Sequence, residues 1–135
     1  HAPLRCRFEP EHLHRVLTNL LDNALRYQSG QPGAVLVSLR HLSGHAGQVQ
    51  LMISISSDGE PITADHERAL FEPFFSTSSR GTGLGLYICR ELCERYGASI
   101  DYRPRPDAER WRNEFVVTMR RATPLVPEAV LPLNG

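Results

Sequence analysis

Three glycines at alternate positions, directly before an amphipathic helix, restrict this chain more than any other feature. Residues 81–86 read Gly-Thr-Gly-Leu-Gly-Leu. The apolar side chains of the helix recur at helical spacing at Leu84, Ile88, Leu92 and Tyr96. Glycine reaches backbone conformations closed to other residues, and N–H groups at a helix N-terminus bind phosphate. The pattern therefore indicates either a phosphate-binding loop or a turn that serves packing alone.

Two common phosphate-binding loops do not fit the sequence. The chain has fifteen basic residues, all of them arginine, whereas a P-loop needs a lysine after its last glycine. A dinucleotide-binding fingerprint needs a third glycine where Leu86 stands, and a hydrophobic strand where residues 73–80 read Pro-Phe-Phe-Ser-Thr-Ser-Ser-Arg. Asp101 is suitably spaced for a ribose-binding acid, but the loop before it belongs to neither class.

Size and charge indicate one globular domain. The chain has 135 residues, of which 41% are hydrophobic and 22% charged, and its formal net charge is zero. We expect a single domain over residues 1–121. Residues 122–135 form a tail whose prolines lie too close together for a helix or a central strand. The balanced charge gives no reason to expect a nucleic-acid partner.

The apolar runs and the cysteines favour a cytoplasmic location. No apolar run approaches the roughly 20 residues that cross a bilayer, and no signal-peptide pattern opens the sequence, so we expect no direct membrane contact. Cys6, Cys89 and Cys93 are an odd set, which suits reduced thiols. Cys89 and Cys93 at helical spacing can hold a metal, but small buried hydrophobes explain them more simply.

Periodicity predicts alternating helices and strands. A short strand over residues 4–8 precedes a helix over residues 9–27, with Pro10 tolerated at its start. The remaining expected elements are a strand hairpin over 34–39 and 49–55, a short helical patch over 66–70, a helix from Gly85 to about Gly97, and strands over 99–103 and 115–119. The segment between residues 56 and 85 is long for a connection, and such loops are usually functional.

Three further segments are candidates for a site. Asn19, Asn23 and Arg26 recur on one face of the first helix, which indicates either a ligand-binding face or a solvated one. Residues 57–62 read Ser-Asp-Gly-Glu-Pro-Ile and close a strand, while residues 70–75 read Leu-Phe-Glu-Pro-Phe-Phe and form an aromatic cluster. Neither of the last two segments is informative alone, but the order of these three segments and the glycine-rich segment along the chain is informative.

The four segments together resemble the catalytic domain of sensor histidine kinases, in the GHKL superfamily shared with gyrase-type topoisomerases and mismatch-repair ATPases. Residues 9–27 look like the N box of that family, 57–62 like its first glycine box, 71–75 like its F box and 81–86 like its second glycine box. The resemblance spans about residues 4–120 and is greatest to the nitrogen-regulation and pilus-type sensor kinases.

The resemblance implies a fold and a ligand. The fold is an α/β two-layer sandwich, with a mixed sheet of about five strands packed on three helices. ATP binds between a helix and a mobile lid, here residues 63–80. Asn23 is then the ligand of the Mg²⁺ that bridges the phosphates, which suits a hard cation that takes few protein ligands. Asn19 supports that site, Arg26 contacts phosphate as a second catalytic residue, and Tyr27 lines the pocket.

The remaining ATP contacts implied by the resemblance lie in the two glycine boxes and the lid. They are Ser57, Asp58, Gly59, Ile62, Phe74, Arg80, Gly81, Thr82, Gly83, Leu84 and Gly85.

The first glycine box departs from the family pattern. That pattern reads Asp-x-Gly-x-Gly, and its Asp accepts a hydrogen bond from the adenine amino group, whereas here Ser57 and Pro61 occupy the first and last positions. Asp58 is adjacent, but successive strand side chains point to opposite faces, so it serves only if a bulge or the turn rotates it inward. We expect weak or atypical adenine recognition.

Asn19 favours phosphotransfer over hydrolysis, because hydrolytic members of the superfamily carry a Glu there as general base. None of the six histidines fits the phosphoacceptor motif. The resemblance therefore implies a His-containing dimerisation domain as partner, a cognate response regulator acting through it, and a homodimeric parent that can be membrane-anchored. Two alternatives stay open: a degenerate domain that acts as a regulatory or docking module, and a serine kinase of the anti-sigma type.

Overall fold

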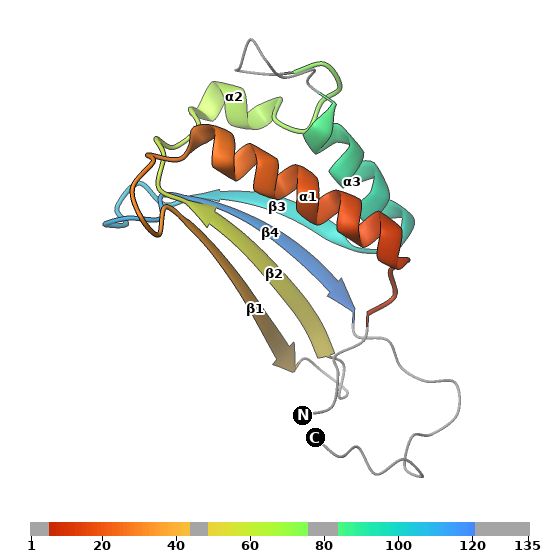
Figure 1. The fold of residues 1–135 in the computed structure, drawn as a ribbon. Helices are drawn as coiled ribbons and strands as arrows, with labels where there is room; N and C mark the ends of the chain where they lie inside the picture. The colour runs from red at the N-terminus through yellow and green to blue at the C-terminus, as the bar shows by residue number, and fades with distance from the viewer. Residues whose placement is uncertain (1–5, 44–48, 76–83, 121–135) are drawn as a thin grey trace, which may run out of the picture.

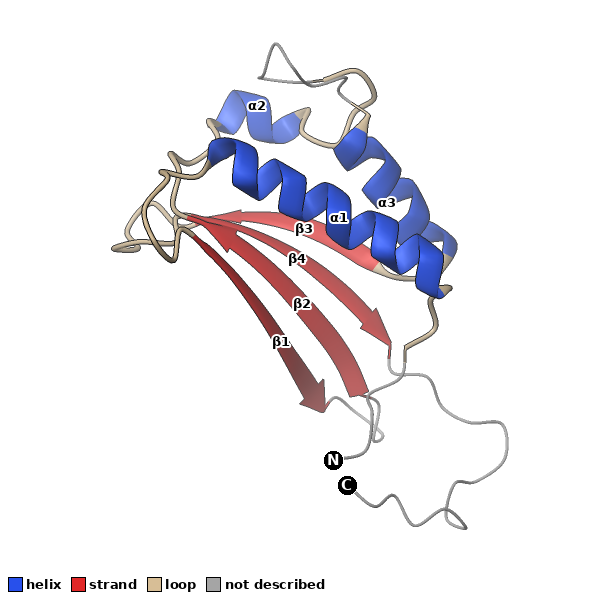
Figure 2. Cartoon of the chain, viewed as in Figure 1, coloured by secondary structure: helices blue, strands red, loops and turns tan. Residues whose placement is uncertain are grey.

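The computed structural model describes residues 6–43, 49–75 and 84–120. Their elements, in chain order, are α1 (Pro10–Tyr27), β1 (Val35–Ser43), β2 (Val49–Ser57), α2 (Ala64–Arg68), α3 (Gly85–Arg95), β3 (Ser99–Pro104) and β4 (Asn113–Arg120). All three helices lie on one face of the sheet, which gives the expected two layers (Figures 1 and 2). Among these residues, no helix is long and apolar enough to cross a membrane.

The described sheet has four strands in the order β1-β2-β4-β3, and every neighbouring pair is antiparallel. The expectation of a mixed sheet is therefore corrected. The crossover through α2 and α3 does make β3 run parallel to β2, but β4 inserts between them and pairs with both. The predicted fifth strand, residues 4–8, lies partly outside the described residues, and Cys6 forms only an isolated bridge.

The first helix forms as its sequence predicts. Pro10 occupies the first turn, where a missing N–H is harmless, and the apolar stripe buries Val16, Leu20 and Ala24. The helix ends at Tyr27 because the next residue, Gln28, is extended. Gly30 and Gly33 then take positive φ angles of 88° and 74°, and the chain turns into β1.

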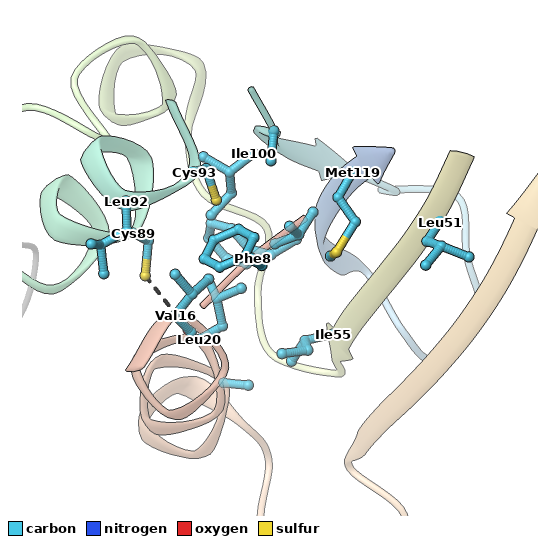
Figure 3. Packing of buried hydrophobic residues seen from close by; sticks show 14 of the residues in the cluster. Phe8, Val16, Leu20, Leu51, Ile55, Cys89, Leu92, Cys93, Ile100 and Met119 are labelled. Atoms are coloured by element: carbon cyan, nitrogen blue, oxygen red, sulfur yellow. Dashed lines mark hydrogen bonds between the residues drawn. The ribbon is translucent and has the colours of Figure 1, made fainter. Parts of the chain in front are cut away.

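The core lies between the helices and the sheet (Figure 3). Cys89 and Cys93 on α3 are fully buried and, like Cys6, carry free thiols. The Cys89 thiol donates to the backbone oxygen of Val16 at 3.6 Å, which joins α3 to α1. Burial raises the pKa of Cys89 to about 12 and that of Cys93 to about 11. These cysteines act as small apolar side chains, and no described group of three or more His, Cys, Asp or Glu could hold a metal ion.

The strand β1 lies at the sheet edge beyond the cover of the helices (Figure 1). Val37 and Leu39 pair with core residues of β2 yet remain more than half exposed. The hairpin strands run further than predicted, to Ser43 and Ser57, while the short helix begins earlier, at Ala64. The tail, residues 122–135, lies outside the described residues.

Candidate functional site

A cavity of about 180 Å³ lies where the C-terminal end of α1, the end of β2 and the start of β4 converge. The described residues that line it are Asn23, Tyr27, Ser57, Glu60, Pro61, Ile62, Thr63, His66, Asn113 and Phe115. Ile62, Phe115 and Pro61 make much of the wall apolar. Pockets for drug-sized ligands usually measure about 300–1,000 Å³, so this cavity suits one planar ring system better than a whole nucleotide.

A hydrogen-bond network fixes one wall of the cavity. The buried Asn113 amide donates to the backbone oxygens of Gly59 at 2.8 Å and Glu60 at 3.2 Å. Its side-chain oxygen accepts from the Tyr102 hydroxyl at 2.5 Å, and the Tyr102 oxygen in turn accepts from the Ile62 N–H at 2.9 Å. Burial raises the pKa of Tyr102. Two strands that are distant in sequence therefore hold residues 59–62 in place.

Gly59 is required by the close approach of this turn to α1. A Cβ atom at residue 59 would collide with the backbone oxygen of Tyr27, and no flexible side chain is available to move aside. The glycine of the first glycine box therefore allows the turn to close against the end of the helix.

Asp58 is bound on the other side of the turn. Its carboxylate accepts from the Ser29 backbone N–H at 2.8 Å and from the Ser29 hydroxyl at 2.5 Å, and these two hydrogen bonds lower its pKa. Its own N–H donates to the Ala34 oxygen at 3.0 Å. Asp58 thus joins the loop after α1 to the turn and does not line the cavity, so no bulge has rotated it inward.

Ser57 does line the cavity, at the end of β2. The residue is only 6% exposed, and no other described residue forms a side-chain hydrogen bond with it. Glu60 lines the rim, but its side chain is 89% exposed and accepts from Arg112 at 3.4 Å. Ser57 is therefore the buried polar group in this wall whose hydroxyl remains available to a ligand.

The polar face of α1 runs from the cavity toward the start of α3. Asn23 is half-buried and lines the cavity, and Asn19, one turn earlier, donates to the backbone oxygen of Gly85 at a long 3.4 Å. The structure therefore brings α1 beside Gly85, the last glycine of the second glycine box. Arg26 is exposed on the same helix and does not contribute to the cavity wall.

The other predicted site residues fall into two groups. Leu84 precedes α3 and is half-buried, Gly85 opens that helix, and Phe74 is 77% exposed with a positive φ of 64°. None of these three lines the cavity. The predicted contacts at Arg80, Gly81, Thr82 and Gly83 lie outside the described residues.

The strand β4 and the segment that opens α2 contribute residues to the site that no sequence motif indicated. Asn113, Phe115, Thr63 and His66 line the cavity, and Tyr102 supports it from β3. Thr63 also caps α2, where its hydroxyl accepts from the His66 N–H at 3.3 Å. One signal was available: asparagine is depleted in strands, so Asn113 beside an apolar run indicates a special role.

Comparisons with known proteins identify the family of the chain. The family model described as histidine kinase-, DNA gyrase B- and HSP90-like ATPase matches residues 8–123. Sensor protein kinase PilS of Pseudomonas aeruginosa is 42% identical over 104 residues, which is 77% of this chain and 19% of PilS. Sensor histidine kinase ZraS of Escherichia coli K12 is 39% identical over 92 residues, 68% of this chain and 18% of ZraS. The chain thus spans about a fifth of the length of these relatives.

Solved structures share the fold. The mycobacterial sensor histidine kinase MprB matches with a TM-score of 0.69 at 24% identity, over 91% of this chain and 81% of that one. Full-length ShkA in complex with AMPPNP matches with a TM-score of 0.57 at 26% identity, over 92% of this chain and 24% of ShkA. The chain therefore belongs to the family of histidine kinase-, DNA gyrase B- and HSP90-like ATPase domains, and its named relatives are sensor histidine kinases.

Proposed function

We propose that this chain binds Mg-ATP and transfers the γ-phosphoryl group to a histidine on a separate dimerisation domain. The observation that carries the proposal is the position of Asn23. Half-buried Asn23 lines the same cavity as Ser57, and Asn19, on the preceding turn of the helix, reaches the start of α3. A base in the cavity would therefore place its phosphates along the polar face of α1, toward the second glycine segment.

Each side chain of the site has a task in this proposal. Tyr27, Ile62 and Phe115 contact the faces of the base. Asn23 provides an amide oxygen for Mg²⁺, which neutralises phosphate charge when bound and takes its other ligands from phosphate and water. Arg26 is exposed one turn after Asn23, and in this proposal its guanidinium donates charge-assisted hydrogen bonds to phosphate oxygens. The resemblance assigns further phosphate contacts to residues 80–83, which lie outside the described residues.

The side chains near the phosphates favour transfer over hydrolysis. Asn19 carries an amide, which cannot accept a proton from water as a carboxylate can. Among the described residues that line the cavity, Glu60 is the one carboxylate, and it is exposed and paired with Arg112. A histidine of a partner domain is therefore the expected acceptor. In this proposal the parent protein is a cytoplasmic or membrane-anchored homodimer that passes the phosphoryl group to a response regulator.

Calorimetric titration with Mg-ATP tests the proposal. Asn23→Ala should weaken binding at least tenfold, because about 1.4 kcal/mol or more depends on the lost metal ligand. Thr18→Ala is the matched control, since Thr18 is an exposed residue of the same helix outside its polar face. Equal affinities of wild type and Asn23→Ala would contradict the proposal. Phosphotransfer is then tested by adding the histidine-bearing domain of the parent and following labelled γ-phosphate.

A second function has one observation in its favour. Ser57 and Pro61 replace the carboxylate and the glycine that the family pattern has in the first glycine box, so the domain can instead be a regulatory or docking module with little affinity for nucleotide. Millimolar or absent binding of Mg-ATP by the wild-type domain would support this function and exclude the first.

A further inference from the structure

The end of the cavity proposed to hold the base has few side chains with a hydrogen bond to offer a ligand. The NH₂ group of Asn113 donates to the backbone oxygens of Gly59 and Glu60, and its side-chain oxygen accepts from the Tyr102 hydroxyl. The same tyrosine oxygen accepts the hydrogen bond of the Ile62 N–H, so that donor is not available to a ligand either. Asn113 therefore has no donor left for a base, and this wall supplies mainly shape and apolar contact.

The carboxylates near this wall are also engaged elsewhere. Asp58 accepts two hydrogen bonds from Ser29 and does not line the cavity. Glu60 lies at the rim, exposed and paired with Arg112. Thr63 and His66 are exposed at the rim as well, and the imidazole of His66 packs edge-on against Phe75 at 5.6 Å. Among the described residues, the buried end of the cavity therefore lacks a negative charge.

The buried polar group that remains is the Ser57 hydroxyl. A hydroxyl can rotate to donate one hydrogen bond or to accept others, whereas an ionised carboxylate can only accept. A carboxylate at this position would bind a 6-amino group and repel a 6-oxo group. A hydroxyl satisfies both, because it accepts from an amino group and donates to a carbonyl oxygen.

We propose that Ser57 makes this site tolerant at the 6-position of the purine, so that 6-oxo purine nucleoside triphosphates bind nearly as well as ATP. This inference rests on the proposed nucleotide function and deepens it. A site rejects an analogue strongly only when the exchange leaves a buried polar group unpaired, and the hydroxyl is paired by either purine.

Inosine triphosphate is the sharpest probe, because its base differs from that of ATP only at the 6-position and in the N1 proton. We expect the wild-type domain to bind Mg-ITP and Mg-ATP with dissociation constants within about threefold, less than the effect of one hydrogen bond of about 1 kcal/mol. Mg-UTP, whose pyrimidine fills less of the cavity, should bind at least about tenfold more weakly.

Two substitutions at residue 57 separate the hydroxyl from its surroundings. Ser57→Asp should bring discrimination, with ITP weakened at least tenfold relative to ATP, because a carboxylate cannot donate to the 6-oxo group. Ser57→Ala should weaken ATP and ITP by the same factor and leave their ratio near that of the wild type. Thermal unfolding of each variant verifies the fold, and the alanine variant keeps the test decisive if the buried charge prevents folding.

The outcomes distinguish this inference from the proposed function. A wild-type preference for ATP over ITP above about thirtyfold, or UTP binding as tight as ATP, would overturn the inference while ATP binding itself stands. Loss of both ATP and ITP in Asn23→Ala, with similar wild-type affinities for the two, supports both proposals. Absence of any triphosphate binding by the wild type overturns both.

Discussion

The two ends of the proposed nucleotide site, called here the base end and the phosphate end, are held by different contacts. The base end is made of strand residues: Ser57 and Asn113 are buried, and a continuous network through Tyr102 fixes the turn between them. At the phosphate end, Asn19 on α1 donates a long hydrogen bond of 3.4 Å to the backbone oxygen of Gly85, the first residue of α3. The base end is thus formed by the fold itself, while the phosphate end has few internal contacts among the described residues. A ligand would complete it.

Substitution of Gly59 at the base end and of Gly85 at the phosphate end should give the largest difference in stability. Gly59→Ala should lower the free energy of unfolding by about 3 kcal/mol, because the new methyl group meets the backbone oxygen of Tyr27 and cannot be accommodated by a side-chain movement. Gly85→Ala is the matched control: its Cβ would enter open space, and alanine favours a helix by about 0.5–1 kcal/mol over glycine.

Chemical denaturation of both variants measures the difference. Equal losses for Gly59→Ala and Gly85→Ala would show that the base end is no more rigid than the phosphate end.

The network behind the base end should show a smaller but measurable effect. Asn113→Ala removes the donors for two backbone oxygens and the acceptor of the Tyr102 hydroxyl, which should cost about 2–3 kcal/mol of stability. Tyr102→Phe should cost about 1 kcal/mol, because the hydroxyl is lost but the ring keeps its contact with Phe115.

A double-mutant cycle measures the coupling between these residues by urea unfolding. The loss in the double variant should be smaller than the sum of the single losses, since the two residues share one network. Thr118→Ala, on the same strand outside the network, should cost less than about 1 kcal/mol. Strict additivity of the two network variants would contradict a rigid base end.

The same contrast explains what the sequence could predict. The helix over residues 10–27 follows from a local pattern, the apolar stripe ending in Leu20 and Ala24 with Pro10 at its start. The resemblance also implied that α1 and the second glycine box bind the same phosphates, and the hydrogen bond from Asn19 to Gly85 holds α1 beside the start of α3. Features set by neighbouring residues were therefore accessible from the sequence.

Features set by long-range pairing were not accessible. Asn113 reaches Gly59 across 54 positions because β4 pairs with β2, and no local pattern records that register. The direction of Asp58 depends on Ser29, which follows α1 and carried no motif. The prediction of a mixed sheet was wrong for the described strands, because the crossover fixes the direction of β3 but not which strand lies beside it. Each of these three features depends on how distant segments of the chain pair.

Asp58 gives the smallest expected effect and tests the connection between the base end and the loop after α1. The two hydrogen bonds from Ser29 lower its pKa in the folded state. A lowered pKa contributes stability above the unfolded value of about 3.9, and this contribution is lost as the pH falls through the folded pKa. Asp58→Asn should therefore lower stability slightly at neutral pH, and the difference from wild type should shrink below about pH 4.

Urea unfolding from pH 7 to pH 3 measures this dependence, with Asp22→Asn on the exposed face of α1 as the matched control. Because Asp58 lies outside the cavity, its replacement should leave the ratio of ATP to ITP affinity unchanged, unlike Ser57→Asp. A pH-independent loss of stability would mean that the charge of Asp58 is irrelevant to the turn. A change in the nucleotide ratio would mean that Asp58, and not Ser57, reads the base, and would place the specificity of the site on the other side of the turn.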